Sequence, residues 1–214
     1  MKLIFENWNK FLLTEAGMKT VADFMSIEGA KMGVYARRTD DGRVGFRYAI
    51  LNEDGTVELH AEQPIYGEVE IESPYFMQRE IGPCDDAWEV KYADVTQGWG
   101  PLLYDIAIEW ATDKGGGLIA DRDDVSDDAK AVWDHYLTKR GDVDNYQLDD
   151  ARNTLTVVDV DNCDQKIAGG VPFYDDDGDT VSKDWVESSL SKRYTKQADI
   201  LNKLKEAGRF VDNT

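Results

Sequence analysis

Hydrophobic residues repeat with two different periods along the chain. From Gly33 they alternate with polar residues, and the pairs Asp41-Gly42 and Asp54-Gly55 interrupt the alternation. Alternation is typical of strands that bury one face, and Asp-Gly pairs favour tight hairpin turns. The sequence therefore predicts antiparallel strands over GVYARRT, RVGFRYAIL and TVELHAEQ, and further strands over IYGEVEIES and AWEVKYADV.

The period becomes helical after the loop QGWGP. One face of the following segment carries Leu102, Leu103, Ile106, Ala107, Trp110 and Ala111, and three glycines at 115–117 end the pattern. LIAD (118–121) predicts a short buried strand, and Ser126 is a suitable N-cap for a helix over 127–139. TLTVVDV (154–160) predicts one more strand, and the polar sequence at about 182–208 predicts a helical end.

This order of elements predicts an α/β or α+β sandwich, with the chemistry at the strand-to-helix turn. The predicted organisation has four parts: an amphipathic segment at 1–15, a linker or short helix at 16–30, a domain at 31–160, and an acidic loop with a helical extension at 161–214. The N-terminal segment has an apolar stripe of Ile4, Phe5, Trp8, Phe11 and Leu12. It is either the first helix of the domain or a detachable peptide.

The charge of the chain excludes some functions. The formal net charge is -19 at pH 7, so a basic face for binding nucleic-acid phosphates is not expected. No apolar run approaches the roughly 20 residues that span a bilayer. Cys84 and Cys163 are too few for a disulfide framework, and the sequence has no metal-ligand cluster of His and Cys.

Aspartates gather in two runs, at 123–128 and at 175–179. Solvated loops and helix starts account for such runs, and two sharper interpretations are a calcium site or a mimic of DNA. Asp175, Asp177 and Asp179 alternate as in an EF-hand, but Gly178 is misplaced and Val186 occupies the twelfth position. We therefore expect no metal.

The segment from Gln97 to Leu102 is the most informative part of the chain. Gly98 and Gly100 allow a tight turn, and Pro101 suits the first turn of a helix. The free amides at such a helix start, with the positive end of the helix dipole, favour a phosphate or pyrophosphate. A compact strand-to-helix turn without a ligand would use the same residues.

The segments VKYADVTQGWGPLLYDIAIEWA and LIADRDDVSDDAKAVWDHY together resemble the GNAT superfamily of acyl-CoA-dependent N-acyltransferases, and more narrowly GNAT-like proteins encoded by tailed phages. The resemblance covers roughly half the chain. It implies a GNAT-like mixed, mostly antiparallel sheet flanked by helices over 31–160, and acetyl-CoA as co-substrate. The implied cofactor-binding residues are Val95, Gln97, Gly98, Trp99, Gly100, Pro101 and Leu102.

The resemblance also indicates catalytic positions and two departures from the family pattern. Ser126 matches the polar residue at the start of the second helix. Trp133 replaces the tyrosine that often protonates the departing CoA thiolate, so Tyr136, one turn later, is the candidate acid; as an inner-face aromatic it also suits a plain core role. Val95 stands where the family loop has Gln or Arg.

The general base is less defined by the sequence. The candidates are Glu68, Glu70, Glu72 and Glu89, each of which we expect to face solvent. His60 and His135 stand at no recognisable spacing from a nucleophile, so a hydrolase triad is not predicted.

The first residues resemble the capsid-targeting peptides of T-even-like phage internal proteins. Such peptides are cleaved after a Glu with Leu or Ile two residues before it and a small residue after it, as in Leu13-Thr14-Glu15-Ala16. The resemblance implies cleavage between Glu15 and Ala16, the prohead scaffold and prohead protease as partners, and a location in the virion interior or the bacterial host cytoplasm.

The expected function is a phage-encoded N-acetyltransferase that acts on an amine-bearing small molecule or a basic protein tail, because an acidic protein attracts cations. The alternative is a non-catalytic protein on the same scaffold, in the virion, in contact with the host, or as an acidic DNA mimic. No direct nucleic-acid or membrane binding is expected.

Overall fold

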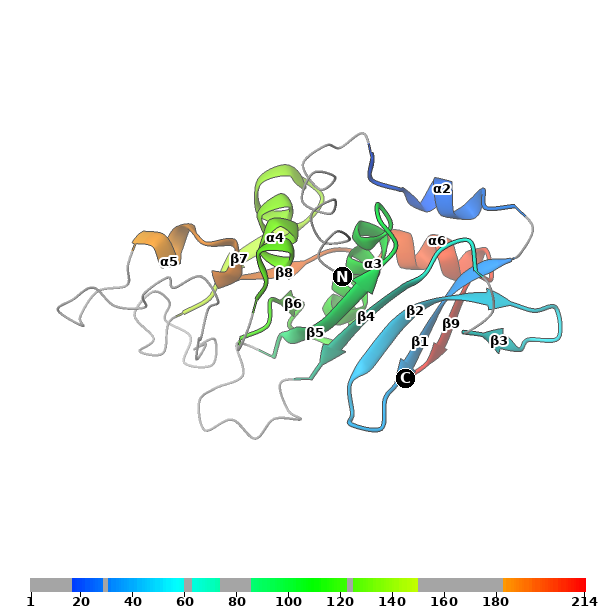
Figure 1. The fold of residues 1–214 in the computed structure, drawn as a ribbon. Coiled ribbons are helices and arrows are strands. Elements are labelled where there is room, and N and C mark those ends of the chain that lie inside the picture. The colour runs from blue at the N-terminus through cyan, green and yellow to red at the C-terminus, as the bar shows by residue number, and fades with distance from the viewer. Residues whose placement is uncertain (1–16, 29–30, 60–62, 74–85, 123–124, 150–182) are drawn as a thin grey trace. The chain divides into compact units, whose positions relative to one another are not determined.

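The computed structural model describes residues 17–28, 31–59, 63–73, 86–122, 125–149 and 183–214 (Figure 1). These residues form a mixed α/β fold with nine strands in one mixed, mostly antiparallel sheet and five helices packed against it. The predicted fold class is therefore confirmed. The N-terminal segment at 1–15, the predicted strand at 154–160 and both cysteines lie outside the described residues.

The strands are β1 (Met32–Arg38), β2 (Val44–Leu51), β3 (Val57–Glu58), β4 (Gly67–Glu72), β5 (Trp88–Val95), β6 (Leu118–Ile119), β7 (Asp144–Gln147), β8 (Lys192–Thr195) and β9 (Phe210–Asn213). The helices are α2 (Val21–Met25), α3 (Gly100–Lys114), α4 (Asp127–Lys139), α5 (Lys183–Glu187) and α6 (Ile200–Glu206), with a 3-10 turn η2 (Ser189–Ser191). The strand order is β7-β8-β6-β5-β4-β2-β1-β9, with β3 paired to β2.

The chain divides into two compact units. The first unit comprises Met1–Glu72, Lys91–Trp110 and Gln197–Thr214, and the second comprises Ser73–Val90 and Ala111–Lys196. Strand β5 and helix α3 each contribute residues to both units.

In the first unit, β1, β2 and β4 form an antiparallel meander. Strands β1 and β2 were predicted to pair through a tight turn, but the third strand of that prediction, TVELHAEQ, is described only as β3 (Val57–Glu58), and β4 is the further strand predicted over IYGEVEIES. Alternation decides which side chains are buried: Val34 and Ala36 of β1 lie on the same face as Phe46 of β2 and Val69 of β4, and all four are inaccessible to water. The Phe46 ring meets Trp110 of α3 edge-on, with ring centroids 5.6 Å apart. The predicted turn at Asp41-Gly42 is present, with Gly42 at a φ of 85°.

The linker or short helix predicted at 16–30 contains a helix, α2. Thr20 and Asp23 form a reciprocal capping box: the Asp23 amide donates to Thr20 Oγ1, and the Thr20 amide donates to Asp23 Oδ2. Phe24 is its buried residue and touches Tyr48 of β2 with 5.2 Å between ring centroids.

The continuous helical end predicted at about 182–208 is wrong over Lys192–Thr195, which form β8. Tyr194 of this strand is fully buried while Arg193 and Thr195 are half-buried, so the segment has the period of a strand inside an otherwise polar sequence. The chain then forms α6 and ends in β9, which pairs in parallel with β1.

A buried carboxylate joins α3 to α6. Glu109 is 0% exposed, and its two carboxylate oxygens accept hydrogen bonds from the amides of Ile200 (3.1 Å) and Leu201 (2.7 Å). Asp199, the residue before α6, makes no side-chain cap of its own. Glu109 therefore caps α6 from another helix, which satisfies donors that the start of any helix leaves unpaired.

In the second unit, β6 lies between β5 and β8. It pairs in parallel with β5 (Trp88↔Leu118, Glu89↔Ile119) and antiparallel with β8 (Leu118↔Tyr194), and β7 pairs antiparallel with β8. Helix α4 begins as predicted at Ser126, whose Oγ accepts from the Ala129 amide at 3.2 Å. None of the described helices is both long and apolar enough to cross a membrane.

Candidate functional site

The turn between β5 and α3 is fixed to the start of β4. Thr96 donates its amide to the Tyr66 carbonyl at 2.8 Å and accepts the Tyr66 amide on Oγ1 at 2.8 Å. Gly98 has a φ of 83°, which L-residues with a side chain rarely adopt, and the Trp99 amide donates to the Thr96 carbonyl at 3.0 Å. The glycine predicted for a tight turn is therefore required by the backbone.

Other residues of the first unit donate hydrogen bonds to the carbonyl groups of this turn. The Tyr48 hydroxyl donates to the Trp99 carbonyl at 2.8 Å, and the Lys19 amide donates to the Gly98 carbonyl at 3.0 Å. Trp99 itself is buried, edge-on to the rings of Tyr48 and Phe24 at centroid distances of 6.2 and 6.1 Å. Burial raises the pKa of Tyr48 well above its usual value, so its hydroxyl remains a donor.

The predicted cofactor-binding residues contribute unequally to an anion site. The Trp99 amide is used inside the turn, and Pro101 has no N–H group. Gly98, Gly100 and Leu102 supply the remaining amides, and the last two lie in the first turn of a 15-residue helix, where the dipole favours negative charge. Gly98 and Gly100 are buried, so access to these amides is narrow.

Ser126 and Tyr136 belong to the second unit and have structural roles there. Ser126 is the N-cap of α4. Tyr136 is 1% exposed, and its ring lies 6.3 Å from Trp133 and 6.2 Å from Tyr194, with the Arg140 guanidinium 5.2 Å from its centroid. The turn and these two residues are not in the same unit.

Three of the four predicted bases are buried, and the expectation that they face solvent is wrong for these three. Glu68, Glu72 and Glu89 are each about 5% exposed, and Glu70 is half-buried. For Glu68 and Glu72 the physical reason is pairing with arginines on the same face: the register places Arg47 of β2 opposite Glu68, and Arg43, which precedes β2, lies near Glu72.

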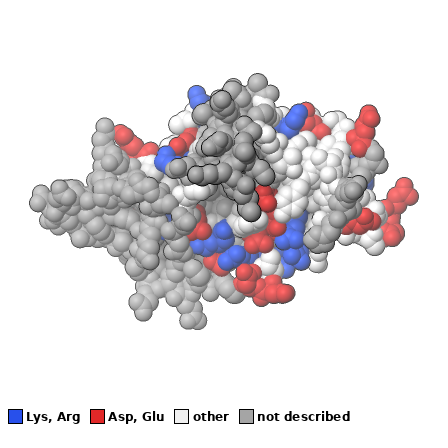
Figure 2. Space-filling view, in the orientation of Figure 1, with Lys and Arg blue, Asp and Glu red and all other residues white. Residues whose placement is uncertain are grey.

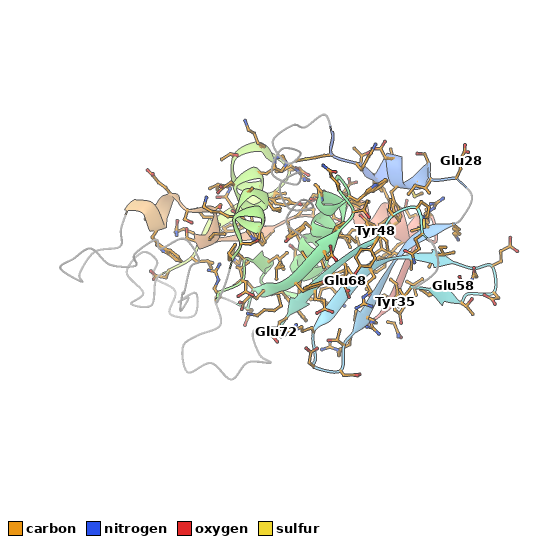
Figure 3. All side chains as sticks on the ribbon, viewed as in Figure 1. Glu28, Tyr35, Tyr48, Glu58, Glu68 and Glu72 are labelled. Atoms are coloured by element: carbon orange, nitrogen blue, oxygen red, sulfur yellow. The ribbon has the colours of Figure 1, made fainter. Side chains whose placement is uncertain are left out.

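An arginine–glutamate network covers this face of β2 and β4. Arg47 is bonded to Glu68, and its second nitrogen lies 3.8 Å from Glu70. Arg43 lies 3.5 Å from the other Glu70 oxygen and 3.7 Å from Glu72. Figure 3 shows Glu68 and Glu72 along β4, and Figure 2 shows basic and acidic side chains interleaved where β2 and β4 lie.

Glu68 has the electrostatics of a proton acceptor. Burial raises the pKa of its carboxyl, the bond and charge of Arg47 lower it, and the neighbouring Glu70 carboxylate raises it again, with a net upward direction. Glu68 stands two residues after Tyr66, the residue to which the β5–α3 turn is bonded. A carboxylate with a raised pKa is a stronger base than a solvated one.

Glu89 is hydrogen-bonded within the second unit. Its Oε1 accepts the Arg122 amide at 2.6 Å, and the Arg122 guanidinium donates in turn to the carbonyls of Ala120 and Leu190 at 3.0 and 2.7 Å. This network ties β5 to the segment after β6. It favours a structural role for Glu89 over that of a catalytic base.

Several predicted features lie outside the described residues: Glu15, Ala16, His60, the aspartates at 123–124 and those at 175–179. Among the described residues, no group of three His, Cys, Asp or Glu side chains is placed to hold a metal ion. Sequence reasoning missed the arginine network and the Glu109 cap. The alternation of Arg43 and Arg47 with Glu68, Glu70 and Glu72 on adjacent predicted strands was the available signal for the network.

Comparison of the chain with protein-family models, with curated proteins and with solved structures finds no match. The function is therefore argued from the residues and geometry of the site.

Proposed function

We propose that the protein is an acyl-CoA-dependent N-acyltransferase that transfers an acetyl group from acetyl-CoA to an amine. The observation that carries this proposal is the connection from β5 through the Gly98 turn and α3 to β6, the parallel neighbour of β5. In sheets with parallel strands, ligands bind beyond the carboxyl ends of the strands, next to helix N-termini. The sequence resemblance to the GNAT superfamily supports the same position.

In the proposed site, the amides of Gly98, Gly100 and Leu102 bind the pyrophosphate of acetyl-CoA. Hydrogen bonds to Lys19 and Tyr48 hold the turn, which limits the reorganisation needed on binding. The amine nitrogen attacks the thioester carbonyl carbon, a C–N bond forms, and the C–S bond breaks. Glu68, directly or through a water, accepts the proton that the amine loses, and the CoA thiolate is protonated from solvent.

The first experiment is calorimetric titration of the protein with acetyl-CoA and with CoA. We expect binding of both, and weaker binding to the Gln97→Glu variant. The carboxylate that this substitution adds, about 4 Å from a phosphate of the ligand, costs about 1 kcal/mol in water, which is about a fivefold loss of affinity for acetyl-CoA. The matched control is Gln197→Glu, which adds the same charge at an exposed residue of the same unit. Absence of binding at millimolar concentration, or equal loss in both variants, contradicts the proposal.

A second candidate is a non-catalytic protein that uses the same scaffold for binding. The burial of Tyr136 among aromatic rings favours it, because a buried core tyrosine cannot deliver a proton to a departing thiolate. Mass spectrometry of amine acceptors incubated with acetyl-CoA distinguishes the two. Binding without any acetylated product supports the second candidate.

A further inference from the structure

An exposed aromatic and acidic surface lies on β5 and around the start of β4 in the first unit, and we name it the Tyr66–Tyr92 surface. The two tyrosines that define it are 48% and 45% exposed, although large apolar side chains are usually covered. Exposed tyrosines of this kind are enriched where proteins bind partners.

The strand register places a pair of carboxylates between these tyrosines. The bonds between Thr96 and Tyr66, and the close approach of Gly67 and Val95, fix β4 and β5 as antiparallel neighbours. Continuing that register puts Asp94 opposite Glu68 and Tyr92 opposite Glu70. Like charges directly opposite each other destabilise a sheet unless a cation offsets them.

The electrostatics of the surface are consistent with this register. After burial, the largest influences that raise the pKa of Tyr66 are the neighbouring charges of Glu68, Tyr92 and Asp94. The pKa of Tyr92 is raised first by burial and then by Asp94, Glu68 and Glu70. Arg43 and Arg47 pair with the glutamates, whereas Asp94 is exposed and forms no ion pair within the described part of the chain.

We propose that the Tyr66–Tyr92 surface binds a lysine-bearing peptide segment in an extended conformation. A lysine ammonium group pairs with the exposed Asp94, with its alkyl stem against the tyrosine rings, where cation–π attraction adds to the charge pairing. Small-molecule sites bury most of their ligand in a concave pocket, whereas the two tyrosines of this surface are nearly half-exposed. Alternate residues of an extended peptide also repeat at about the spacing of alternate residues along β4.

This inference names the acceptor class of the proposed transferase, and for the transfer step it rests on that function. Binding of the peptide is measured without acetyl-CoA, so the transferase proposal and the surface proposal can be tested independently. If the peptide binds and acetyl-CoA does not, the transferase proposal fails and the surface stands. If acetyl-CoA binds and the peptide does not, the surface proposal fails alone.

The test is titration of the full chain with a capped peptide of alternating lysine and glycine. Asp94→Asn should weaken binding about fivefold, the value of one near charge pair in water, and Tyr92→Ala about two- to fivefold through the lost cation–π contact. The matched controls, Asp40→Asn and Tyr146→Ala, remove an exposed aspartate and an exposed tyrosine elsewhere and should bind as wild type. Binding should also weaken as salt is raised.

Three outcomes would overturn the proposal. The first is wild-type affinity in both Asp94→Asn and Tyr92→Ala. The second is equal binding of the same peptide with acetylated lysines, which would show that the ammonium charge is not read. The third is tighter binding of the polyamine spermidine through the same two residues, which would make the occupant a small molecule.

Discussion

Helices α3 and α4 begin in opposite ways. Helix α4 is capped by its own Ser126, which accepts the Ala129 amide. Helix α3 follows Trp99, whose indole has no acceptor atom, and continues with Pro101, which has no amide hydrogen. Helix α6 is intermediate, because Glu109 of another helix caps it. At the starts of α4 and α6, side chains of the protein accept hydrogen bonds from backbone amides. The start of α3 has no such side-chain cap, and there we propose a ligand.

The largest effect on stability is expected at Glu109, the residue of α3 that caps α6. Glu109→Ala leaves two amides of α6 unpaired in a buried environment, and it should lower the free energy of unfolding by about 3 kcal/mol. Urea denaturation followed by circular dichroism measures this loss. Glu206→Ala, at an exposed position of α6, is the control and should be close to neutral. Equal stability of the two variants would show that the start of α6 does not depend on Glu109.

A smaller loss is expected at the turn before α3. Gly98→Ala forces a side chain into the left-handed region, which costs about 1–2 kcal/mol. Gly141→Ala is the matched control, because a Cβ there meets no atom within 4 Å. Thermal unfolding of the two variants compares them. A Gly141→Ala variant as unstable as Gly98→Ala would contradict the geometry of the turn.

Ser126→Ala should cost about 1 kcal/mol, the usual value of an N-cap, and Ser126→Asp should keep most of that stability. The affinity for acetyl-CoA should not change in either variant, since the hydroxyl already serves the Ala129 amide. Calorimetry after the unfolding measurement tests this. A large loss of acetyl-CoA affinity in Ser126→Ala would contradict this expectation and indicate that Ser126 takes part in ligand binding.

The smallest effect is expected just beyond the other end of α4, where Arg140 is bonded to Asp142 at 2.8 Å. This bond lowers the pKa of Asp142 from 3.8 to about 2. The pair therefore stabilises the fold above about pH 3.8 and loses that contribution as the pH falls through about 2. Asp142→Asn should flatten this acidic part of the stability curve by a small amount, because the Asp142 carboxylate is exposed to solvent. An unchanged acid profile would contradict the pairing.

The sequence was most informative where a pattern is local. Alternation predicted β1, β2, β4 and β5, and the helical stripe predicted α3 and α4, because burial of one face depends on residues two, three or four apart. Strands β7, β8 and β9 have four residues each, too few for alternation to stand out. They are strands because neighbouring strands pair with them.

The candidate site was predicted only in part for the same reason. The Gly98 turn and the Ser126 cap are read from adjacent residues, and both are present. The burial of Glu68 depends on Arg47, a residue 21 positions earlier that reaches it only through the β2–β4 register. The Tyr66–Tyr92 surface likewise depends on which strands become neighbours.

The dependence of α6 on Glu109 has a consequence for synthesis on the ribosome. The first unit needs residues 197–214, which include the amides bonded to Glu109 and the strand β9 that pairs with β1. Until this stretch has left the ribosome, the nascent chain carries a carboxylate without these two donors and a β1 edge without β9. We therefore expect a ribosome-arrested chain ending at residue 196 to be cleaved by protease in the first unit, and protease resistance to appear only when residues 197–214 have also left the ribosome.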